Sequence, residues 1–417
     1  MIESSPIPYF SYCNFCGKPA TEVKGLWTGN GAAICNDCVT RYQASLTPLP
    51  LPVKPVSREQ FVVPRPAEIK QHLDLYCVGQ EQAKKTLAVA VHNHYKRVQQ
   101  ILQHPEGDDV QIEKSNILMT GPTGSGKTLL ARTLAKVLDV PFAMVDVSML
   151  AEEAGGQVDA EMILLRLLQN ADYQPEAARH GIVYIDEIDK IAHQTAGNDG
   201  TGSHYGKRLQ QTLLKIIEGT VCRLTVQDEA RFPKPQVIRL DTSEILFICG
   251  GAFVGLEKII QRRLGRTTLG HTQKNAIAAR DEILLRVEPE DLLQFGLIPE
   301  FVGRLPVIAT LLPLDENQLV AALTEPKNAL VKQYVKLLAM EGVELEFTTD
   351  ALRELASQAL LKETGARALR GLVERIMLDV MYEAPESTNP VHVKITKPVV
   401  EGKIKPVVQH HYWGGTS

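Results

Sequence analysis

The chain has 417 residues, 44% of them hydrophobic and 23% charged, with a formal net charge of -4 and a pI near 6.3. This length accommodates two or three domains with separate cores, and the composition is ordinary for a soluble globular protein. The slight acidic excess argues against nucleic acid as the main partner, since proteins that bind polyanions usually carry a basic excess. No apolar run is long enough to span a bilayer, and the first residues lack the basic start and apolar core of a secretory signal. The sequence therefore predicts a cytoplasmic protein whose partner is neither a membrane nor a nucleic acid.

Four of the seven cysteines form two Cys-x2-Cys pairs near the N-terminus, Cys13 with Cys16 and Cys35 with Cys38. Four thiolates on tight turns can surround one Zn²⁺ in a closed tetrahedral site that leaves no position open for substrate. Such a site is structural, because a short module buries too little core to fold without the metal. Two disulfides are the alternative, which a reducing compartment disfavours. We therefore predict a zinc-binding module over residues 1–46.

The next segments predict a linker and a large α/β domain. Prolines at 48, 50, 52 and 55 make residues 47–64 an extended linker. From about residue 65, short apolar runs alternate with amphipathic helical patterns. The apolar runs are Asn116–Thr120, Phe142–Val147, Ile182–Ile185, Ile245–Ile248 and Val307–Leu311. Strands that alternate with helices predict a mainly parallel sheet with helices on both faces, which we place at residues 65–313.

After Leu314 the pattern becomes mainly helical, with strand candidates at Val343–Phe347 and Val391–Ile395. This change predicts a smaller α+β domain over residues 314–417. Within the larger domain, the stretch Thr195–Tyr205 is rich in Gly, Asn and Ser, which predicts a mobile loop.

A phosphate-binding loop is predicted by the run GPTGSGKT, which matches G-x-x-x-x-G-K-[ST] between an apolar segment and a helical pattern. Glycines let backbone N–H groups turn toward phosphates, and the N-terminus of the following helix adds positive potential. Lys127 is expected to reach the β- and γ-phosphates of ATP, and the Thr128 hydroxyl to bind Mg²⁺. A glycine-rich turn without function is the alternative, which the flanking elements disfavour. The predicted nucleotide contacts here are Gly121, Pro122, Thr123, Gly124, Ser125, Gly126, Lys127, Thr128 and Leu129.

A second apolar strand ends in two acids, Asp186 and Glu187. An Asp at a strand end beside the phosphate loop can hold Mg²⁺, and the adjacent Glu can polarise the water that attacks the γ-phosphate. Adjacent acids at a strand end are common and often only cap a helix. Their pairing with the phosphate loop upstream makes ATP hydrolysis the predicted activity.

Seven segments resemble the ClpX family of AAA+ ATPases in order and in spacing. They are VGQEQAKK, GPTGSGKT, YIDEIDKI, LLKIIEGT, ILFICGGAF, FGLIPEFVGRLP and KETGARALR. The four N-terminal cysteines match as well, so the resemblance covers nearly the whole chain. The run GLIPEFVGRLP is far more specific than any general ATPase motif.

The resemblance implies a ring of six subunits that hydrolyses ATP at subunit boundaries and pulls polypeptide through a central channel. It implies that Arg304 is an arginine finger acting on the neighbouring subunit's γ-phosphate and that Arg367 is the sensor arginine of the small domain. It also implies that Val78 and Gly79 contact adenine. A surface ion pair is the alternative for each arginine. The implied partners are unfolded or tagged protein substrates, the ClpP peptidase, and adaptor proteins that bind the zinc module.

Departures from the family pattern gather in the segments that handle polypeptide. The aromatic pore loop Gly-Tyr-Val-Gly corresponds to Ala154–Gln157, where no ring is present to grip a chain. The second pore loop corresponds to Tyr205–Arg208, and the basic cluster at the channel entrance to Ala230–Phe232. The ClpP-docking tripeptide Ile-Gly-Phe corresponds to Thr267–Gly270, which reads Thr-Thr-Leu-Gly, and the loss of apolar anchors weakens an interface.

Three functions remain open at this point. The first is a protein unfoldase that delivers substrates to ClpP. The second is a divergent paralogue that remodels protein partners without ClpP, or that joins mixed rings. The third is an AAA+ ATPase that acts on nucleic acid, which the near-neutral charge disfavours.

Overall fold

The computed structural model describes residues 11–29, 32–46, 62–103, 110, 112–148, 160–193, 201–226, 235–265, 282–362, 364–383 and 391–410. The chain divides into two compact units, Met1–Phe61 and Val62–Ser417. The predicted division into four segments at 46, 64 and 313 is finer than this and stays a prediction.

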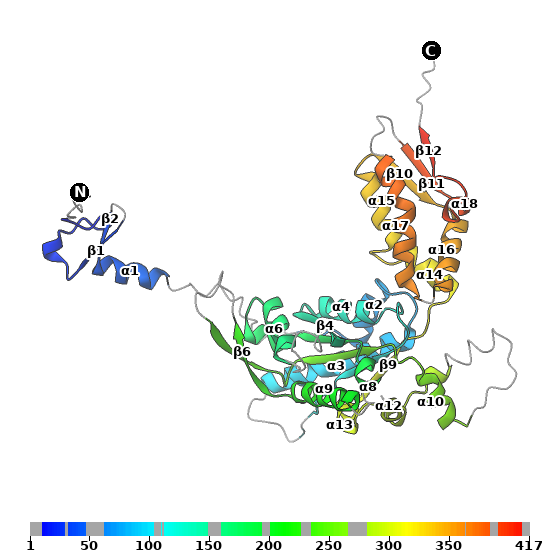
Figure 1. Cartoon of the computed structure of the whole chain (residues 1–417), viewed down its shortest axis with the longest axis horizontal. Coiled ribbons are helices and arrows are strands. Elements are labelled where there is room, and N and C mark those ends of the chain that lie inside the picture. Colours follow the sequence, from blue (N-terminus) through cyan, green and yellow to red (C-terminus); the bar gives the residue numbers. More distant parts are fainter. Residues whose placement is uncertain are drawn as a thin grey trace, which may run out of the picture. The chain divides into compact units, whose positions relative to one another are not determined.

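The first unit is a hairpin followed by one helix (Figure 1). A short 3-10 helix, η1 (Ala20–Glu22), precedes antiparallel strands β1 (Leu26–Gly29) and β2 (Ala32–Cys35), and α1 (Asn36–Leu46) follows. Among its described residues, the buried cluster consists of Cys13, Cys35 and Cys38, with three partly buried apolar side chains packed against it. An apolar cluster of this size cannot hold a domain together without a further stabilising element.

The second unit is built around a five-stranded sheet of order β4-β5-β8-β3-β9, in which every neighbouring pair is parallel. The strands are β3 (Ile117–Thr120), β4 (Phe142–Asp146), β5 (Ile182–Asp186), β8 (Leu246–Gly251) and β9 (Val307–Thr310). All five coincide with the predicted apolar runs, and β3 and β8 are buried along their whole length. The predicted α/β class with a parallel sheet is confirmed.

Helices cover both faces of this sheet, with α2 and α4 on one side and α9 and α13 on the other in the view of Figure 1. Their bounds are α2 (Pro66–Asp74), α3 (Glu81–Gln103), α4 (Lys127–Leu138), α6 (Ala160–Asn170), α7 (Pro175–Ala178), α8 (Asp189–His193), α9 (Thr201–Glu218), α10 (Leu256–Arg263), α12 (Pro289–Phe295) and α13 (Pro299–Gly303). Strand β3 is followed by α4 and lies between β8 and β9, which come late in the chain. In open parallel sheets, ligands bind beyond the carboxyl ends of the strands, where the strand order reverses relative to the chain order. The carboxyl end of β3 is such a position.

Two parts of the larger domain differ from the sequence prediction. The predicted loop Thr195–Tyr205 is wrong in its second half, because α9 begins at Thr201. The apolar side chains of Leu209, Leu213 and Ile216 are buried at helical spacing, so core packing stabilises the later part of this helix. The antiparallel hairpin β6 (Val221–Val226) and β7 (Gln236–Asp241) was not predicted, because its residues alternate between apolar and polar instead of forming an apolar run.

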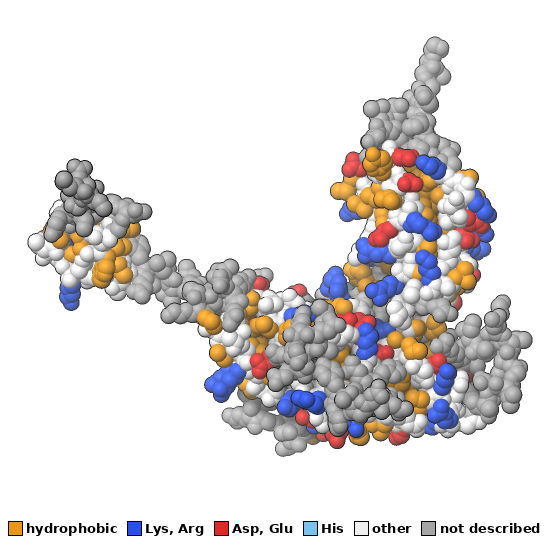
Figure 2. Space-filling model, in the orientation of Figure 1, with side chains coloured by type: hydrophobic (Ala, Val, Ile, Leu, Met, Phe, Trp, Pro, Cys, Tyr) orange, Lys and Arg blue, Asp and Glu red, His pale blue; other side chains and the backbone are white. Residues whose placement is uncertain are grey.

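The C-terminal part of the second unit has its own apolar core and sheet. Its helices are α14 (Glu316–Thr324), α15 (Leu330–Ala339), α16 (Thr349–Leu361), α17 (Ala366–Glu383) and α18 (Lys397–Val400). Strand β10 (Val343–Phe347) pairs in parallel with β11 (Val391–Ile395), and β11 pairs antiparallel with β12 (Val407–His410). Both predicted strands are present, and β12 is additional. Basic and acidic side chains are interspersed over this part on the face shown in Figure 2.

Among the described helices of the chain, none combines the length and apolar character needed to cross a membrane.

Candidate functional site

The predicted phosphate loop is the turn between β3 and α4, and neighbouring backbone fixes its shape. Gly121 has φ +149° and Gly124 has φ +77°, values that favour glycine. A Cβ at Gly121 would lie 2.4 Å from the backbone oxygen of Leu311, and a Cβ at Gly124 would lie 2.2 Å from that of Thr364. Side chains at these two positions would therefore clash with backbone, and the loop depends on their absence.

Lys127 is held inside this loop. Its side chain is 9% exposed, and its Nζ donates hydrogen bonds to the backbone oxygens of Gly121 (2.6 Å) and Pro122 (2.9 Å). Burial lowers the pKa of the Lys127 ammonium, and the nearby carboxylates of Asp186 and Asp189 act in the opposite direction. A partly desolvated cation within a ring of backbone groups is suited to binding a phosphate.

Asp186 and Thr128 form an oxygen pair at the ends of β5 and the phosphate loop. The Thr128 hydroxyl donates to Asp186 Oδ2 at 3.1 Å, and the Tyr184 hydroxyl donates to Oδ1 at 3.1 Å. A hydroxyl and a carboxylate at this spacing are hard oxygen donors of the kind that Mg²⁺ binds. These two residues therefore fit the predicted magnesium site.

Glu187 follows directly in a left-handed conformation, with φ +58°. The Ser148 hydroxyl donates to its Oε2 at 3.2 Å, and Lys190 forms an ion pair with the same oxygen. Lys190 Nζ also donates to Ser148 Oγ at 3.1 Å. The carboxylate that is expected to act on water is thus held by two neighbours in a backbone conformation rare for a non-glycine residue.

Sequence reasoning missed these neighbours of Glu187 and also Asp189. The Asp189 side chain is buried and accepts hydrogen bonds from the backbone amides of Ala252 and Phe253, both at 3.2 Å, so it ties the end of β5 to the end of β8. Lys190 could have been found from its i,i+3 spacing to Glu187 in a helix-start pattern. Ser148 carries no such signal, because it approaches Glu187 from the end of another strand.

Two adjoining cavities meet at the phosphate loop. The first, of ≈ 390 Å³, is lined mainly by apolar side chains of the α2–α3 turn, α14 and α15, and includes Val78 and Leu330. The second, of ≈ 550 Å³, is lined by charged groups that include Lys127, Asp186 and Glu187. Both are lined by Gly124, Gly126, Leu129 and Ala366. One apolar end and one charged end match the base and the phosphates of a nucleotide.

The cavities bring together most of the predicted site residues. Predicted residues in the apolar cavity are Val78, Gly124, Ser125, Gly126 and Leu129. Those in the charged cavity are Thr123, Gly124, Gly126, Lys127, Thr128, Leu129, Asp186, Glu187 and Arg367. Gly79, Gly121 and Pro122 line neither. Gly79 instead lies against the Gln318 side chain, with φ +64°.

The start of α17 contacts the phosphate loop directly. The backbone amide of Ala366 donates to Gly124 O at 3.3 Å, and the next residue, Arg367, lines the same charged cavity as Glu187. Backbone contact at Gly124 means that the C-terminal part cannot move without disturbing the loop.

Arg304 lies apart from these cavities, at the C-terminal end of α13. Its side chain is 54% exposed, and its Nε donates to Glu218 Oε1 at 3.0 Å. Within one chain, Arg304 therefore forms a surface ion pair, which is the alternative to the arginine-finger role that the family resemblance implies.

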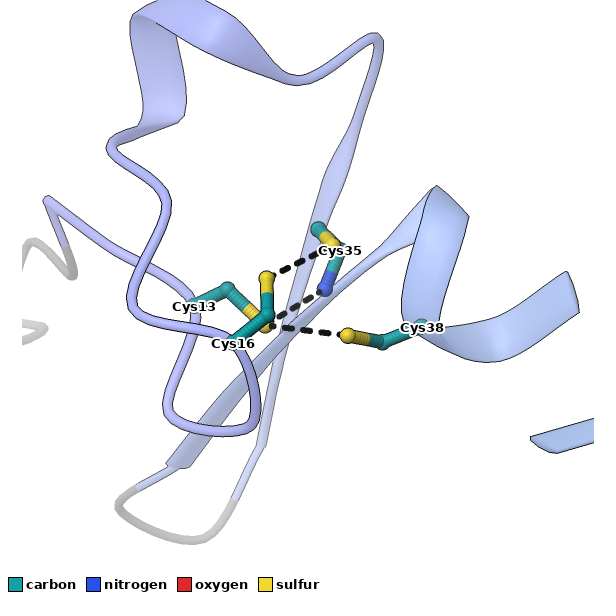
Figure 3. A group of neighbouring side chains, drawn as sticks. All are labelled: Cys13, Cys16, Cys35 and Cys38. Atoms are coloured by element: carbon teal, nitrogen blue, oxygen red, sulfur yellow. Dashed lines mark hydrogen bonds between the residues drawn. The ribbon is translucent and has the colours of Figure 1, made fainter. Parts of the chain in front are cut away.

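The four N-terminal cysteines converge in the first unit (Figure 3). Their sulfur atoms all lie within 4.8 Å of one another, with Cys13 to Cys38 at 3.9 Å and Cys16 to Cys35 at 3.6 Å. Sulfurs about 2.3 Å from a tetrahedral Zn²⁺ are about 3.8 Å apart, so the observed spacing fits zinc and is far too long for disulfides.

Backbone amides support this thiolate cluster. The amide of Cys35 donates to Cys13 Sγ at 3.3 Å. Burial raises the pKa of the Cys13 thiol, but hydrogen bonds from the backbone of Cys16, Cys35 and Phe15 outweigh this and lower it. Burial and hydrogen bonds with the other cysteines raise the pKa of the Cys38 thiol, so a metal that binds all four sulfurs must displace a proton. The cluster is a structural Zn²⁺ site.

Three segments of the polypeptide-handling prediction, Ala154–Gln157, Ala230–Phe232 and Thr267–Gly270, lie outside the described residues. The assignment of Tyr205–Arg208 to a pore loop is corrected, because these residues lie within α9.

Three family models match the chain. Residues 11–46 match the ClpX C4-type zinc finger, residues 112–308 match the AAA domain (Cdc48 subfamily), and residues 314–395 match the C-terminal, D2-small domain of ClpB protein. The first match covers the cysteine cluster, and the second covers the phosphate loop, Asp186 at the end of β5 and the adjacent Glu187.

Two curated relatives match almost end to end. The ATP-dependent Clp protease ATP-binding subunit ClpX of Bacteroides thetaiotaomicron is 47% identical over 382 residues, which span 90% of this chain and 92% of the relative. The protein of the same name from Porphyromonas gingivalis is 46% identical over 381 residues, with the same coverage.

Proposed function

This chain belongs to the ClpX family of AAA+ ATPases, and on that premise we propose that it couples ATP hydrolysis to the unfolding of protein substrates for a ClpP-type peptidase. It is an ATPase and not itself a peptidase. The observation that carries the proposal is the charged cavity in which Lys127, Asp186 and Glu187 meet.

The residues of this cavity divide the work of hydrolysis. Lys127 binds the β- and γ-phosphates of ATP, while Thr128 and Asp186 hold Mg²⁺. Mg²⁺, when bound, neutralises charge on the phosphates. Glu187 accepts a proton from the attacking water once Ser148 and Lys190 leave it free to do so.

The apolar cavity takes the base, and Val78 and Leu129 line it. Gly79 and Gly121 act indirectly, by shaping the chain beside the ligand. Arg367 senses the phosphates from α17, so nucleotide occupancy changes the angle of the C-terminal part through the Ala366–Gly124 contact.

Arg304 completes a neighbouring subunit's site instead of its own. This assignment rests on the family motif, and it requires that the Glu218 ion pair be exchanged for a phosphate. A guanidinium there neutralises charge in the transition state, an effect of about 10³–10⁵ in rate. Assembly as a homo-hexamer or mixed hexamer is part of this proposal.

The remaining partners are proposed from the family alone. They are unfolded or tagged proteins, adaptors that bind the zinc module, and ClpP, in a cytoplasmic setting without membrane or nucleic acid. A second candidate, a paralogue that remodels proteins without ClpP, is favoured by the sequences Ala-Gly-Gly-Gln at Ala154–Gln157 and Thr-Thr-Leu-Gly at Thr267–Gly270.

A folded fluorescent reporter with a ClpX-type recognition tag tests both candidates. The reporter is mixed with the full chain and ATP, with and without ClpP, and Glu187→Gln serves as the control that binds but does not turn over ATP. Fluorescence loss without ClpP together with proteolysis with ClpP supports the first candidate. Unfolding without ClpP-dependent proteolysis supports the second, ATP hydrolysis without unfolding of the reporter contradicts the first and favours the second, and absence of ATP hydrolysis contradicts both.

A further inference from the structure

The β6–β7 hairpin carries two arginines directly opposite each other. In its antiparallel register Arg223 pairs with Arg239, between the pairs Val221–Asp241 and Thr225–Val237. Because paired residues point to the same face, all six side chains lie on one side of the hairpin.

This face is exposed, whereas the opposite face is anchored in the core. Leu224, Val226 and Leu240 are buried, so the register is fixed and the two arginines cannot slip apart. Val221 is 60% exposed and Val237 is 63% exposed. The face therefore combines two cations with aliphatic surface at both ends. Figure 2 shows basic and apolar side chains at the end of the unit where Figure 1 labels β6.

Neither arginine forms an ion pair or a side-chain hydrogen bond with any described residue. The acid on this face, Asp241, accepts a hydrogen bond from the amide of Ser243 at 2.9 Å and makes no ion pair within the described part of the chain. Two other arginines of the same unit do form ion pairs: Arg263 pairs with Asp291 at 2.9 Å, and Arg179 pairs with Glu244 at 2.5 Å. Like charges directly opposite each other destabilise a sheet, and no ion pair with a described residue relieves the repulsion between Arg223 and Arg239.

We propose that the outer face of β6–β7 is a docking surface for an acidic segment of a polypeptide. Two guanidinium groups on adjacent strands can bind carboxylates with paired hydrogen bonds, while Val221 and Val237 receive aliphatic side chains that flank the acids. This inference rests on the proposed function in one respect, because that function makes polypeptides the substrates. It adds that the polypeptide segments bound at this surface are acidic.

A nucleic acid fits this face less well. Single-strand binders combine a basic groove with aromatic side chains that stack on bases, and none of the six residues on this face is aromatic. The nine residues that join the strands contain two acids and two bases, so they add no net positive charge.

The test is a binding titration of full-length protein with a fluorescein-labelled oligoglutamate peptide, followed by fluorescence anisotropy at low and physiological salt. The ATP-loaded Glu187→Gln protein is used as background, so that binding is measured without unfolding or turnover. Arg223→Gln and Arg239→Gln are each expected to weaken binding about two- to fivefold, and the double variant more. The matched control is Arg353→Gln, which removes one exposed charge from α16 and is expected to bind like the parent.

Thermal unfolding gives a second readout. Either hairpin variant is expected to unfold at a higher temperature than the parent, because it removes a like-charge pair. The proposal is overturned if both variants bind oligoglutamate as the parent does, if oligoglutamine binds equally well, or if a single-stranded oligonucleotide binds more tightly. It is also overturned if the variants fail to assemble as the parent does, since the arginines would then serve contacts between copies of the chain. Failure of the reporter assay would leave oligoglutamate binding unaffected, so the two proposals fail separately.

Discussion

The zinc module and the nucleotide cleft, which consists of the apolar and charged cavities at the phosphate loop, both bind a metal ion, yet their folds are stabilised in opposite ways. Around the cysteines, the buried cluster that the described residues form contains only Cys13, Cys35 and Cys38, so the metal must supply the core. Around the cleft, a five-stranded sheet and two apolar cores exist without a ligand, and backbone contacts shape the phosphate loop. A metal can therefore be required for a domain to fold, or it can bind to a domain that folds without it. The amount of buried apolar surface decides between these two cases.

The sharpest test of this comparison is removal of zinc. A chelator, or Cys35→Ser, is expected to unfold residues 11–46 completely, because structural zinc contributes about 10–16 kcal/mol to such modules. Limited proteolysis followed by mass spectrometry measures the loss, and ATP turnover by the second unit is expected to persist. Cys222→Ser is the control, since this isolated cysteine in β6 is not expected to change zinc content. A protease-resistant first unit after complete chelation would show that the comparison is wrong.

In the nucleotide cleft, Glu187→Gln is expected to lower the rate of ATP turnover without unfolding the domain. Removing a general base typically lowers turnover about 10²–10⁴-fold, while the residues that bind ATP stay in place. Phosphate release measures turnover, and equilibrium binding of a fluorescent ATP analogue measures affinity. Turnover close to that of the parent would assign the base to another residue.

Backbone packing in the cleft is tested by Gly124→Ala. The added Cβ would meet Thr364 O at 2.2 Å in a left-handed conformation, so we expect a destabilisation of about 1–3 kcal/mol and weaker ATP binding. Gly371→Ala is the matched control, because nothing lies within 4 Å of its added Cβ in helix α17, and it is expected to stabilise the unit by up to about 1 kcal/mol. Thermal unfolding of both variants separates a clash from a general effect of replacing glycine. Equal shifts in the same direction would contradict the role given to the loop contact.

The sequence predicts those features whose residues are adjacent in the chain, and it does not predict those that depend on tertiary contacts. The strands at Ile182 and Val307, the phosphate loop and the cysteine pairs are contiguous patterns whose chemistry is contained in a few adjacent residues. The α2–α3 turn and α17 reach the nucleotide site only through tertiary packing, so the family resemblance was needed to propose Val78 and Arg367. Ser148 could not be found, because its contact with Glu187 depends on two parallel strands ending at the same level.

The smallest expected effect concerns Lys190, whose hydrogen bond with Glu187 raises the pKa of the lysine. Lys190 is about half exposed, so the ion pair is worth no more than about 1 kcal/mol after screening by solvent. Lys190→Met should therefore lower ATP turnover by less than about fivefold, because Glu187 loses one of the two groups that orient it. Ser148→Ala should also lower ATP turnover. The fold decrease in the double variant should be smaller than the product of the two single fold decreases, since Lys190 also contacts Ser148. A larger loss for Lys190→Met than for Glu187→Gln would mean that the lysine itself contacts the phosphates, and the charged cavity would then have two cations with that role.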